Sequence, residues 1–176
     1  PISGGMADKF SRVGRARGAC DQICLRSRSG RTGAVHRLRL LAHAAGNLQL
    51  QLHEDGPDFA AWCSYKYLNS GPGGVAGVFV HERHANNPDL PRFAGWWGND
   101  PKTRFQMGRE FTPQEGAAGW QLSNAPVLAM AALKASLELF DRAGMSALRQ
   151  KSEALTGYML ELIDAIPNER FEIITP

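Results

Sequence analysis

The sequence predicts a single α/β domain, because two short apolar runs are followed by two long segments with helical periodicity. The 176 residues are 43% hydrophobic and 21% charged, so the chain can bury one sizeable core and is not disordered throughout. No apolar run reaches about 18 residues, and no basic-then-apolar secretory signal opens the chain. Three cysteines without repeated CxxC spacing favour reduced thiols. We therefore expect a soluble cytoplasmic protein.

Two strands are expected in the first half of the chain. Residues 59–63 form an apolar run after the turn signal at 55–58, and residues 75–80 form another that is rich in β-branched side chains. Both are interpreted as buried strands. The glycines and proline of residues 64–74 break regular structure between them, so Lys66 stands at the exit of the first strand.

A long irregular segment and two helices are expected next. Residues 85–124 hold four prolines and three of the four tryptophans, which predicts an excursion that serves function or contacts a partner. The first helix should start near Asn124 as N-cap, with Pro126 in its opening turn, and end at Gly144. A second helix should span 146–166 and stop at Pro167, before a strand that begins at 171–175.

Positive charge is concentrated at the start of the chain. The net charge is +3, but residues 1–40 hold nine Lys or Arg against two Asp, which gives +7 there and −4 elsewhere. The segment shows no helical or strand period and little aromatic interleaving. Nucleic-acid binding is therefore the less favoured interpretation, and solvated surface the more favoured one.

Lys66 is the first candidate for chemistry. An ammonium between two tyrosines at a strand end, followed by a glycine-rich loop, would be partly desolvated, and Schiff-base lysines need such surroundings. A surface lysine whose stem lies on Tyr65 and Tyr67 is the alternative. Tyr65 is either an acid, base or phosphate donor, or a half-buried structural tyrosine. Residues 71–74 lack the nucleotide-loop pattern, so we interpret them as a tight turn.

The remaining candidates carry weaker signals. His81 and His84 are three residues apart, not four as in helical zinc-protease motifs, so metal ligation is not expected. His43 and His53 have no partner at ligand spacing. Trp96 and the adjacent Trp97 form an aromatic wall that would stack on a planar ligand, fill a subunit contact or pack in the core.

Several motifs in a fixed order carry a resemblance to a known family. They are Cys63-Ser64-Tyr65-Lys66-Tyr67-Leu68-Asn69, Gly71-Pro72-Gly73-Gly74, Phe79-Val80-His81-Glu82-Arg83-His84, Gly95-Trp96-Trp97-Gly98 and Ser123-Asn124-Ala125-Pro126. From about Leu41 to Pro176 the chain resembles kynureninase, a pyridoxal-phosphate enzyme of tryptophan catabolism. The resemblance implies part of the large domain of an aminotransferase-like, fold-type-I enzyme: a mostly parallel sheet with flanking helices, in an obligate homodimer with shared active sites.

The resemblance also implies roles for single residues. Lys66 would carry pyridoxal 5′-phosphate as an imine, Tyr65 would bond the phosphate and exchange a proton, and His43 would lie beside the pyridine ring. Trp96 and Asn124 would reach the neighbouring subunit's site, one toward the phosphate and one toward the aromatic end of the substrate. The implied reaction is hydrolysis of L-kynurenine or 3-hydroxykynurenine to anthranilate or 3-hydroxyanthranilate and L-alanine, with the cofactor as electron sink.

The chain departs from the family pattern at several points. Leu40 stands where the family has the aspartate that pairs with the pyridine nitrogen, which weakens the electron sink. Asn99 replaces a histidine found in many relatives near the substrate ring. The family's N-terminal half and its C-terminal, carboxylate-binding arginine have no counterpart. We therefore expect a fragment, truncated at both ends, that is inactive alone.

Three regions follow from this interpretation: 1–40, unrelated to the family; 41–145, part of the cofactor domain; and 146–176, a helix and the start of the small domain. His36 to Leu40 can be encoded as CAT CGG CTT CGA C, and the next frame reads Ile-Gly-Phe-Asp, so residues 1–40 are hypothesised to be out of frame. The alternatives are a non-catalytic remnant that only dimerises, and another lyase or desulfurase of the same superfamily.

Overall fold

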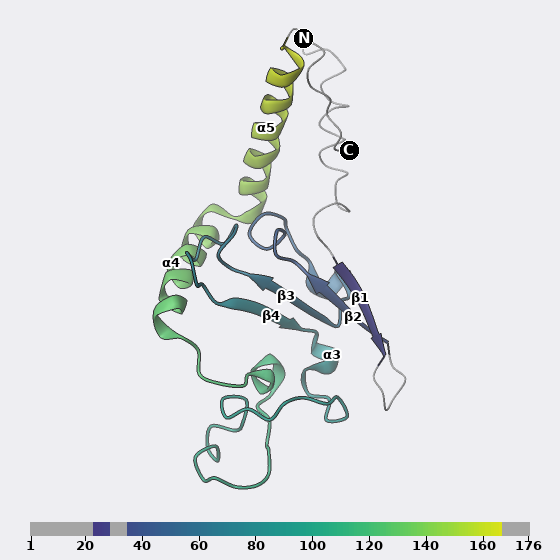
Figure 1. Ribbon diagram of the computed structural model, residues 1–176, viewed down its shortest axis with the longest axis vertical. Coiled ribbons are helices and arrows are strands. Elements are labelled where there is room, and N and C mark those ends of the chain that lie inside the picture. The colour runs from purple at the N-terminus through teal and green to yellow at the C-terminus, as the bar shows by residue number, and fades with distance from the viewer. Residues whose placement is uncertain (1–22, 29–34, 167–176) are drawn as a thin grey trace.

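The computed structural model describes residues 23–28 and 35–166, whose strands form one mixed sheet (Figure 1). The strand order is β1 (Ile23–Arg28), β2 (Val35–Leu40), β3 (Phe59–Cys63) and β4 (Ala76–Val80). β2 and β3 are parallel, whereas the β1–β2 and β3–β4 pairs are antiparallel. Two long helices follow the sheet in the chain, so the predicted α/β class is confirmed.

β1 and β2 differ from the expectation that the first forty residues show no helical or strand period. In β2, Leu38 and Leu40 nevertheless alternate with Arg37 and Arg39, which is the two-residue period of a strand. Leu38 pairs with Phe59 and Leu40 with Ala61 in the parallel ladder. The expectation that residues 1–40 hold no periodic element is therefore wrong for 23–28 and 35–40.

β3 occupies the predicted residues, and β4 begins at Ala76, one residue later than predicted. The prediction that both strands are buried is wrong: Ala60 is the buried residue of β3 and Val80 that of β4. Exposure alternates along β4, and Val78 is 64% exposed. The sequence pattern is apolar on both faces, but β4 is the outer strand of the described sheet and one of its faces has no covering layer there. Whether the side chains of β4 are buried therefore depends on a covering layer and not on the apolar sequence of the strand.

The core is small and lies where β2 passes into a turn. Leu41, Ala44 and Ala60 are almost fully buried. Partly buried side chains surround them, from the crossover between β2 and β3 and from β3 and β4: Leu48, Leu50, Leu52, Trp62 and Phe79. Helix α2 (Leu52–Asp55) belongs to this crossover. The core therefore fixes the turn after β2 against the centre of the sheet.

Residues 86–115 contain no helix or strand of their own, which confirms the expected irregular excursion. The short helix α3 (Glu82–Ala85) precedes it, and the 3₁₀ helix η1 (Gly116–Trp120) follows it. A single bridge joins Asn99 to Pro113 within the excursion. In Figure 1 the excursion lies below the sheet, beyond the end of β4.

Helices α4 (Val127–Ala143) and α5 (Met145–Asp164) confirm the two predicted helices, and Gly144 separates them with φ of 74°. The predicted N-cap is wrong: Pro126 holds that position, and Asn124 Oδ1 accepts from Ser123 Oγ. Ala125 precedes Pro126, and a residue before a proline avoids helical backbone angles, so the helix cannot extend back to Asn124. The strand expected at 171–175 lies outside the described residues.

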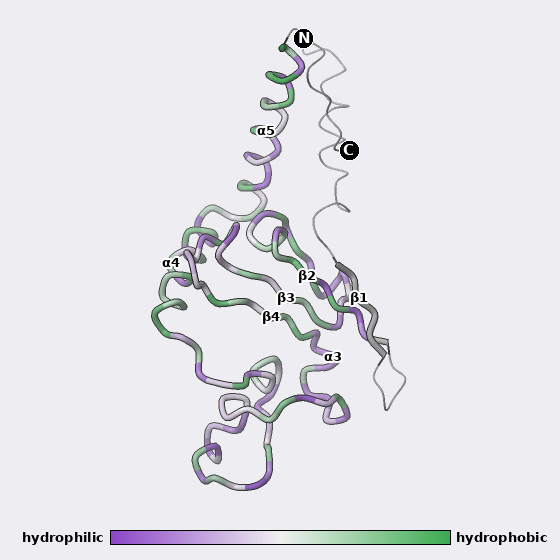
Figure 2. The backbone as a smooth tube through the Cα atoms, viewed as in Figure 1, coloured by the Kyte–Doolittle hydropathy of each residue, from purple (hydrophilic) through white to green (hydrophobic). Residues whose placement is uncertain are grey.

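α5 extends away from the sheet, and hydrophobic residues are spread along it (Figures 1 and 2). Four of its apolar side chains are more than half exposed: Leu155, Tyr158, Met159 and Leu162. No buried residue occurs in α5, and Ser136 is the buried residue of α4. No helix in the described part of the chain is both long and apolar enough to cross a membrane.

Candidate active site around Lys66

Lys66 and His43 meet at one end of the sheet. Lys66 follows β3, and His43 lies in the turn that follows β2; because β2 and β3 are parallel, both strands end on the same side. Leu41 N–H donates to Ala61 O over 2.8 Å and fixes this turn to β3. Lys66 Nζ lies 2.6 Å from His43 Nε2. A hydrogen bond at this distance fixes the position of the Lys66 amine beside the His43 imidazole.

The loop that carries Lys66 is closed at its neck by hydroxyl groups. Ser64 Oγ lies 2.6 Å from Ser70 Oγ and donates to Val75 O, while Ser70 N–H donates to Ser64 O. Ser64 and Ser70 are both buried. A Cβ at Gly74 would lie 1.9 Å from Ser70 Oγ, so only glycine fits there. The amine is thus presented by a rigid loop and not by a flexible one.

Two further segments support the same loop. Gly46 has φ of 83°, and a Cβ on it would lie 2.9 Å from Tyr67 C and 3.0 Å from Leu68 N. Ser136, on α4, donates its hydroxyl to Leu68 O over 2.6 Å. The turn after β2 and the helix α4 therefore hold residues 67–68 from two sides.

The tyrosines beside Lys66 are accessible. Tyr65 is 53% exposed and Tyr67 is 46% exposed. Lys66 Nζ lies 6.0 Å from the centre of the Tyr65 ring, and the Tyr67 ring meets His43 edge-on at 6.4 Å. The phenol of Tyr65 is therefore free to meet a ligand at the mouth of the loop.

Leu40 is the last residue of β2 and pairs with Ala61 of β3. It lies at the same end of the sheet as His43, because the turn that contains His43 follows it directly. A leucine side chain provides no charge to pair with a protonated ring nitrogen. The position thus differs chemically from the aspartate that the resemblance implies.

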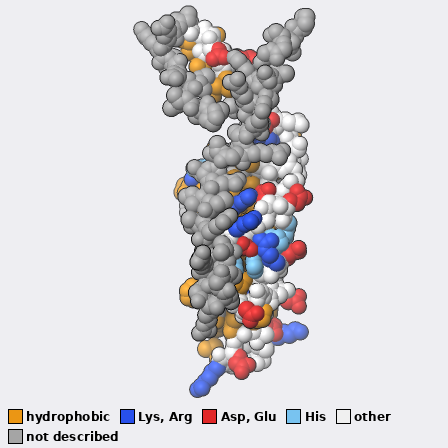
Figure 3. Space-filling model, turned by 90° about the vertical axis from the view of Figure 1, so that its right-hand side faces the viewer, with side chains coloured by type: hydrophobic (Ala, Val, Ile, Leu, Met, Phe, Trp, Pro, Cys, Tyr) orange, Lys and Arg blue, Asp and Glu red, His pale blue; other side chains and the backbone are white. Residues whose placement is uncertain are grey.

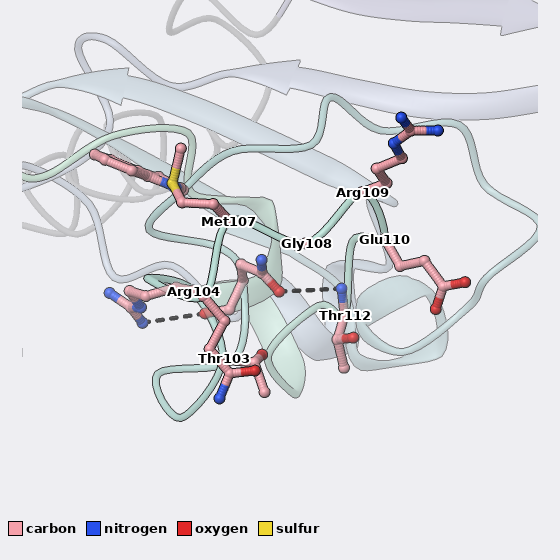
Figure 4. Close-up of a pocket in the computed structure, with 10 residues that line it drawn as sticks. Thr103, Arg104, Met107, Gly108, Arg109, Glu110 and Thr112 are labelled. Carbon is pink, nitrogen blue, oxygen red and sulfur yellow. Dashed lines mark hydrogen bonds between the residues drawn. The ribbon is translucent and has the colours of Figure 1, made fainter.

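Trp96 and Asn99 line a separate open groove of about 540 Å³ in the irregular excursion (Figure 4). Asn99 Oδ1 accepts from the amides of Asp100 and Thr112, at 2.9 and 3.0 Å. Arg104 is 8% exposed, lies 4.7 Å above the Trp97 ring and donates to Asn99 O over 3.1 Å. Asn99 and Arg104 therefore shape this groove through backbone contacts.

The two groups of candidate residues occupy opposite ends of the sheet. Cys63 pairs with Ala76 at the lysine loop, whereas Phe59 pairs with Val80 at the end from which the excursion departs. Figure 1 shows α4 beside the first end and the excursion at the second. Asn124 is exposed just before α4. The structure therefore joins Lys66, Tyr65 and His43, and it keeps Trp96 and Asn99 apart from them.

Asp58, which the sequence indicates only as part of a turn signal, is a buried carboxylate with three hydrogen-bond donors around it. Its carboxylate accepts from the Arg37 amide at 2.6 Å, from Arg83 Nε at 2.9 Å and from His84 Nε2 at 2.5 Å. Burial raises the pKa of Asp58, but these three donors outweigh it and lower the pKa to about 2. The partners are 21, 25 and 26 residues away, too far for any local pattern to show.

No family model matches the chain. The chain is 67% identical over 136 residues to kynureninase of Myxococcus xanthus, 65% over 135 residues to that of Koribacter versatilis and 64% over 136 residues to that of Xanthomonas oryzae pv. oryzae. Over most of its length the chain is therefore similar to kynureninases. Each match covers 77% of the chain and 32% of the relative, so the chain spans about a third of the length of these curated kynureninases.

Among solved structures, the chain is similar to the apo cysteine desulfurase of Thermococcus onnurineus NA1, with a TM-score of 0.48 and 17% identity. The likeness covers 72% of this chain and 30% of the desulfurase.

Proposed function

We propose that this chain supplies the cofactor-lysine segment of a kynureninase, which hydrolyses L-kynurenine or 3-hydroxykynurenine to anthranilate or 3-hydroxyanthranilate and L-alanine. The observation that carries the proposal is the contact of 2.6 Å between Lys66 Nζ and His43 Nε2, within a chain that is 67% identical to a kynureninase over 136 residues. The implied cofactor is pyridoxal 5′-phosphate, which supplies an electron sink when it is bound.

The residues fit this cofactor in one respect and not in another. The partly buried amine of Lys66, with an imidazole beside it and an open phenol next to it, fits a planar aldehyde. Leu40 does not fit, because it places an apolar side chain where the resemblance puts a carboxylate. The site therefore suits covalent attachment better than it suits stabilisation of charge on the ring.

Each side chain has a task that its position supports. Lys66 provides the attaching amine, and His43 takes the proton from Lys66 Nζ or returns it. Tyr65, which is 53% exposed, donates its phenol proton to an anionic group at the mouth of the loop. Ser64 and Ser70 keep the loop in one conformation, so that these groups stay in place.

We propose further that a second subunit completes the site. Trp96 and Asn99 lie at the end of the sheet opposite Lys66, too remote to act on the same bound molecule within one chain. In a two-fold dimer, this end of one subunit can approach the lysine loop of the other. Trp96 would then reach the phosphate, and Asn99 and Asn124 the aromatic end of the substrate.

We place the protein in the cytoplasm, since its cysteines lack a disulfide spacing.

Reductive trapping tests the assignment of Lys66. The purified chain is incubated with pyridoxal phosphate, reduced with borohydride, digested and mapped by mass spectrometry. We expect a pyridoxyl label on Lys66 that disappears in Lys66→Ala and persists in Lys134→Ala, whose side chain is 79% exposed on α4. A label that prefers Lys134 or spreads over the other lysines would contradict the proposal.

Turnover is a separate measurement. We expect no release of anthranilate from kynurenine by the chain alone, because it spans about a third of the length of the kynureninases it matches. Anthranilate fluorescence follows the reaction directly. Turnover that is lost in Lys66→Ala would support the lysine assignment and would overturn the expectation that this chain is too incomplete to be active.

A further inference from the structure

Three side chains from different elements converge away from Lys66. His36 comes from β2, Asp58 from the residue before β3, and His84 from α3. Each places one potential ligand atom within 4.8 Å of the others. Histidine side chains lie among basic and acidic ones on the face shown in Figure 3. Two imidazoles and one carboxylate are a common ligand set for Zn²⁺ and similar ions.

The two histidines carry ring nitrogens without a hydrogen-bond partner in the described part of the chain. They are His36 Nε2 and His84 Nδ1, and both atoms are buried. A buried polar atom without a partner destabilises the folded state, so such atoms need an explanation. His84 Nε2 and Asp58 Oδ1 lie 2.5 Å apart, close enough for both atoms to contact one ion.

The Asp58 carboxylate is held in place by a backbone hydrogen bond, as metal-binding carboxylates often are. The Arg37 amide donates to Asp58 Oδ2 over 2.6 Å, and the Asp58 side chain is only 10% exposed. A hydrogen bond from a group that does not itself bind the metal holds the metal ligand in place. Arg83 Nε also donates to Asp58 Oδ1, at 2.9 Å, and Arg83 Nη2 donates to Gly56 O at 2.8 Å. A cation that takes Oδ1 would displace the first of these bonds, and the Arg83 side chain, 42% exposed, would keep the second.

We propose that His36, Asp58 and His84 bind a divalent transition metal such as Zn²⁺, with water in the remaining position. The ion would tie β2 to the start of β3 and to α3. The proposal does not rest on kynureninase chemistry, and His36 lies before the segment 41–176 that resembles the family. The sequence argument considered His84 only with His81 and expected no metal; the spatial partners of His84 are instead His36 and Asp58.

Cobalt(II) is the probe, because tetrahedral Co²⁺ absorbs visible light strongly. The full chain is stripped with a chelator and titrated with Co²⁺ while absorbance and melting temperature are followed. We expect a tetrahedral spectrum, saturation at one ion per chain and a rise in melting temperature. His36→Gln should weaken binding roughly tenfold or more and abolish the thermal shift. Because His36 Nε2 has no partner in the described residues, this substitution removes no hydrogen bond at that atom.

His53→Gln is the matched control. His53 belongs to a second group with His81 and Glu82, and its side chain is exposed. Unchanged Co²⁺ affinity in His53→Gln, with loss in His36→Gln, supports the site. Equal affinity in His36→Gln and the parent chain, loss in His53→Gln, or no tetrahedral spectrum at all would each overturn it and leave Asp58 as the centre of a metal-free hydrogen-bond cluster.

Discussion

Gly46→Ala tests whether the turn after β2 presses against the lysine loop. Gly46 has φ of 83°, and an added Cβ would lie 2.9 Å from Tyr67 C and 3.0 Å from Leu68 N. Gly116 is the matched control, because it has φ of 70° and nothing lies within 4 Å of its added Cβ. Alanine is strained by the positive φ at both positions, but it meets the loop backbone only at position 46.

The magnitude follows from this difference. A positive φ costs an alanine roughly 1–2 kcal/mol, so Gly116→Ala should lower the free energy of unfolding by about 1 kcal/mol. Overpacking against a backbone that cannot turn aside adds roughly 1–3 kcal/mol. Gly46→Ala should therefore be less stable than Gly116→Ala by about 2 kcal/mol, and the effects of alanine on the unfolded chain cancel in the comparison.

Urea denaturation of the two variants measures this difference, provided that their m-values agree. The pyridoxyl label on Lys66 provides a second reading, since Gly46→Ala should reduce it and Gly116→Ala should not. Equal stabilities, together with equal labelling, would show that Gly46 and residues 67–68 are not in contact, and the description of the loop's support would be wrong.

Three more outcomes are expected. Ser136→Ala removes the 2.6 Å bond to Leu68 O and should lower the free energy of unfolding by about 1 kcal/mol in urea; no change would exclude that bond. The Asp58 pKa is about 2 instead of 3.8, so this carboxylate stabilises the fold above pH 3.8, and about 2 kcal/mol is lost between about pH 4 and 2. In chelator, Asp58→Asn should flatten that acid-unfolding profile, and an unchanged slope would contradict this. Arg104→Met should lower stability by about 2 kcal/mol and shift tryptophan fluorescence through Trp97, 4.7 Å away; an unaltered spectrum would speak against the stacking.

The features that the sequence predicts well are local ones. β3 and the two long helices appear where apolar spacing and stop signals place them, with Gly144 between the helices. Asn124 predicts the start of α4 wrongly, because Pro126 restricts the backbone before it and takes the N-cap position itself. The sequence does carry a signal for β2, since Leu38 and Leu40 alternate with arginines over residues 37–40.

The features that the sequence does not predict are contacts between distant residues. His43 and Lys66 are 23 residues apart, and only the resemblance to kynureninase linked them. Ser136 reaches Leu68 across 68 residues, and no periodicity indicates such a contact. The exposure of Val78 was also missed, because an apolar pattern cannot show whether another layer covers the strand.

β4 has a consequence for the handling of the protein. It is one of the two edge strands of the described sheet and is five residues long, and its exposed Val78 lies on a strand that has a neighbour in this sheet on one side only. Such an edge is a template on which another extended chain can add by hydrogen bonding. At high concentration, intermolecular strand addition will compete with the native fold, and a charged residue in place of Val78 will delay precipitation.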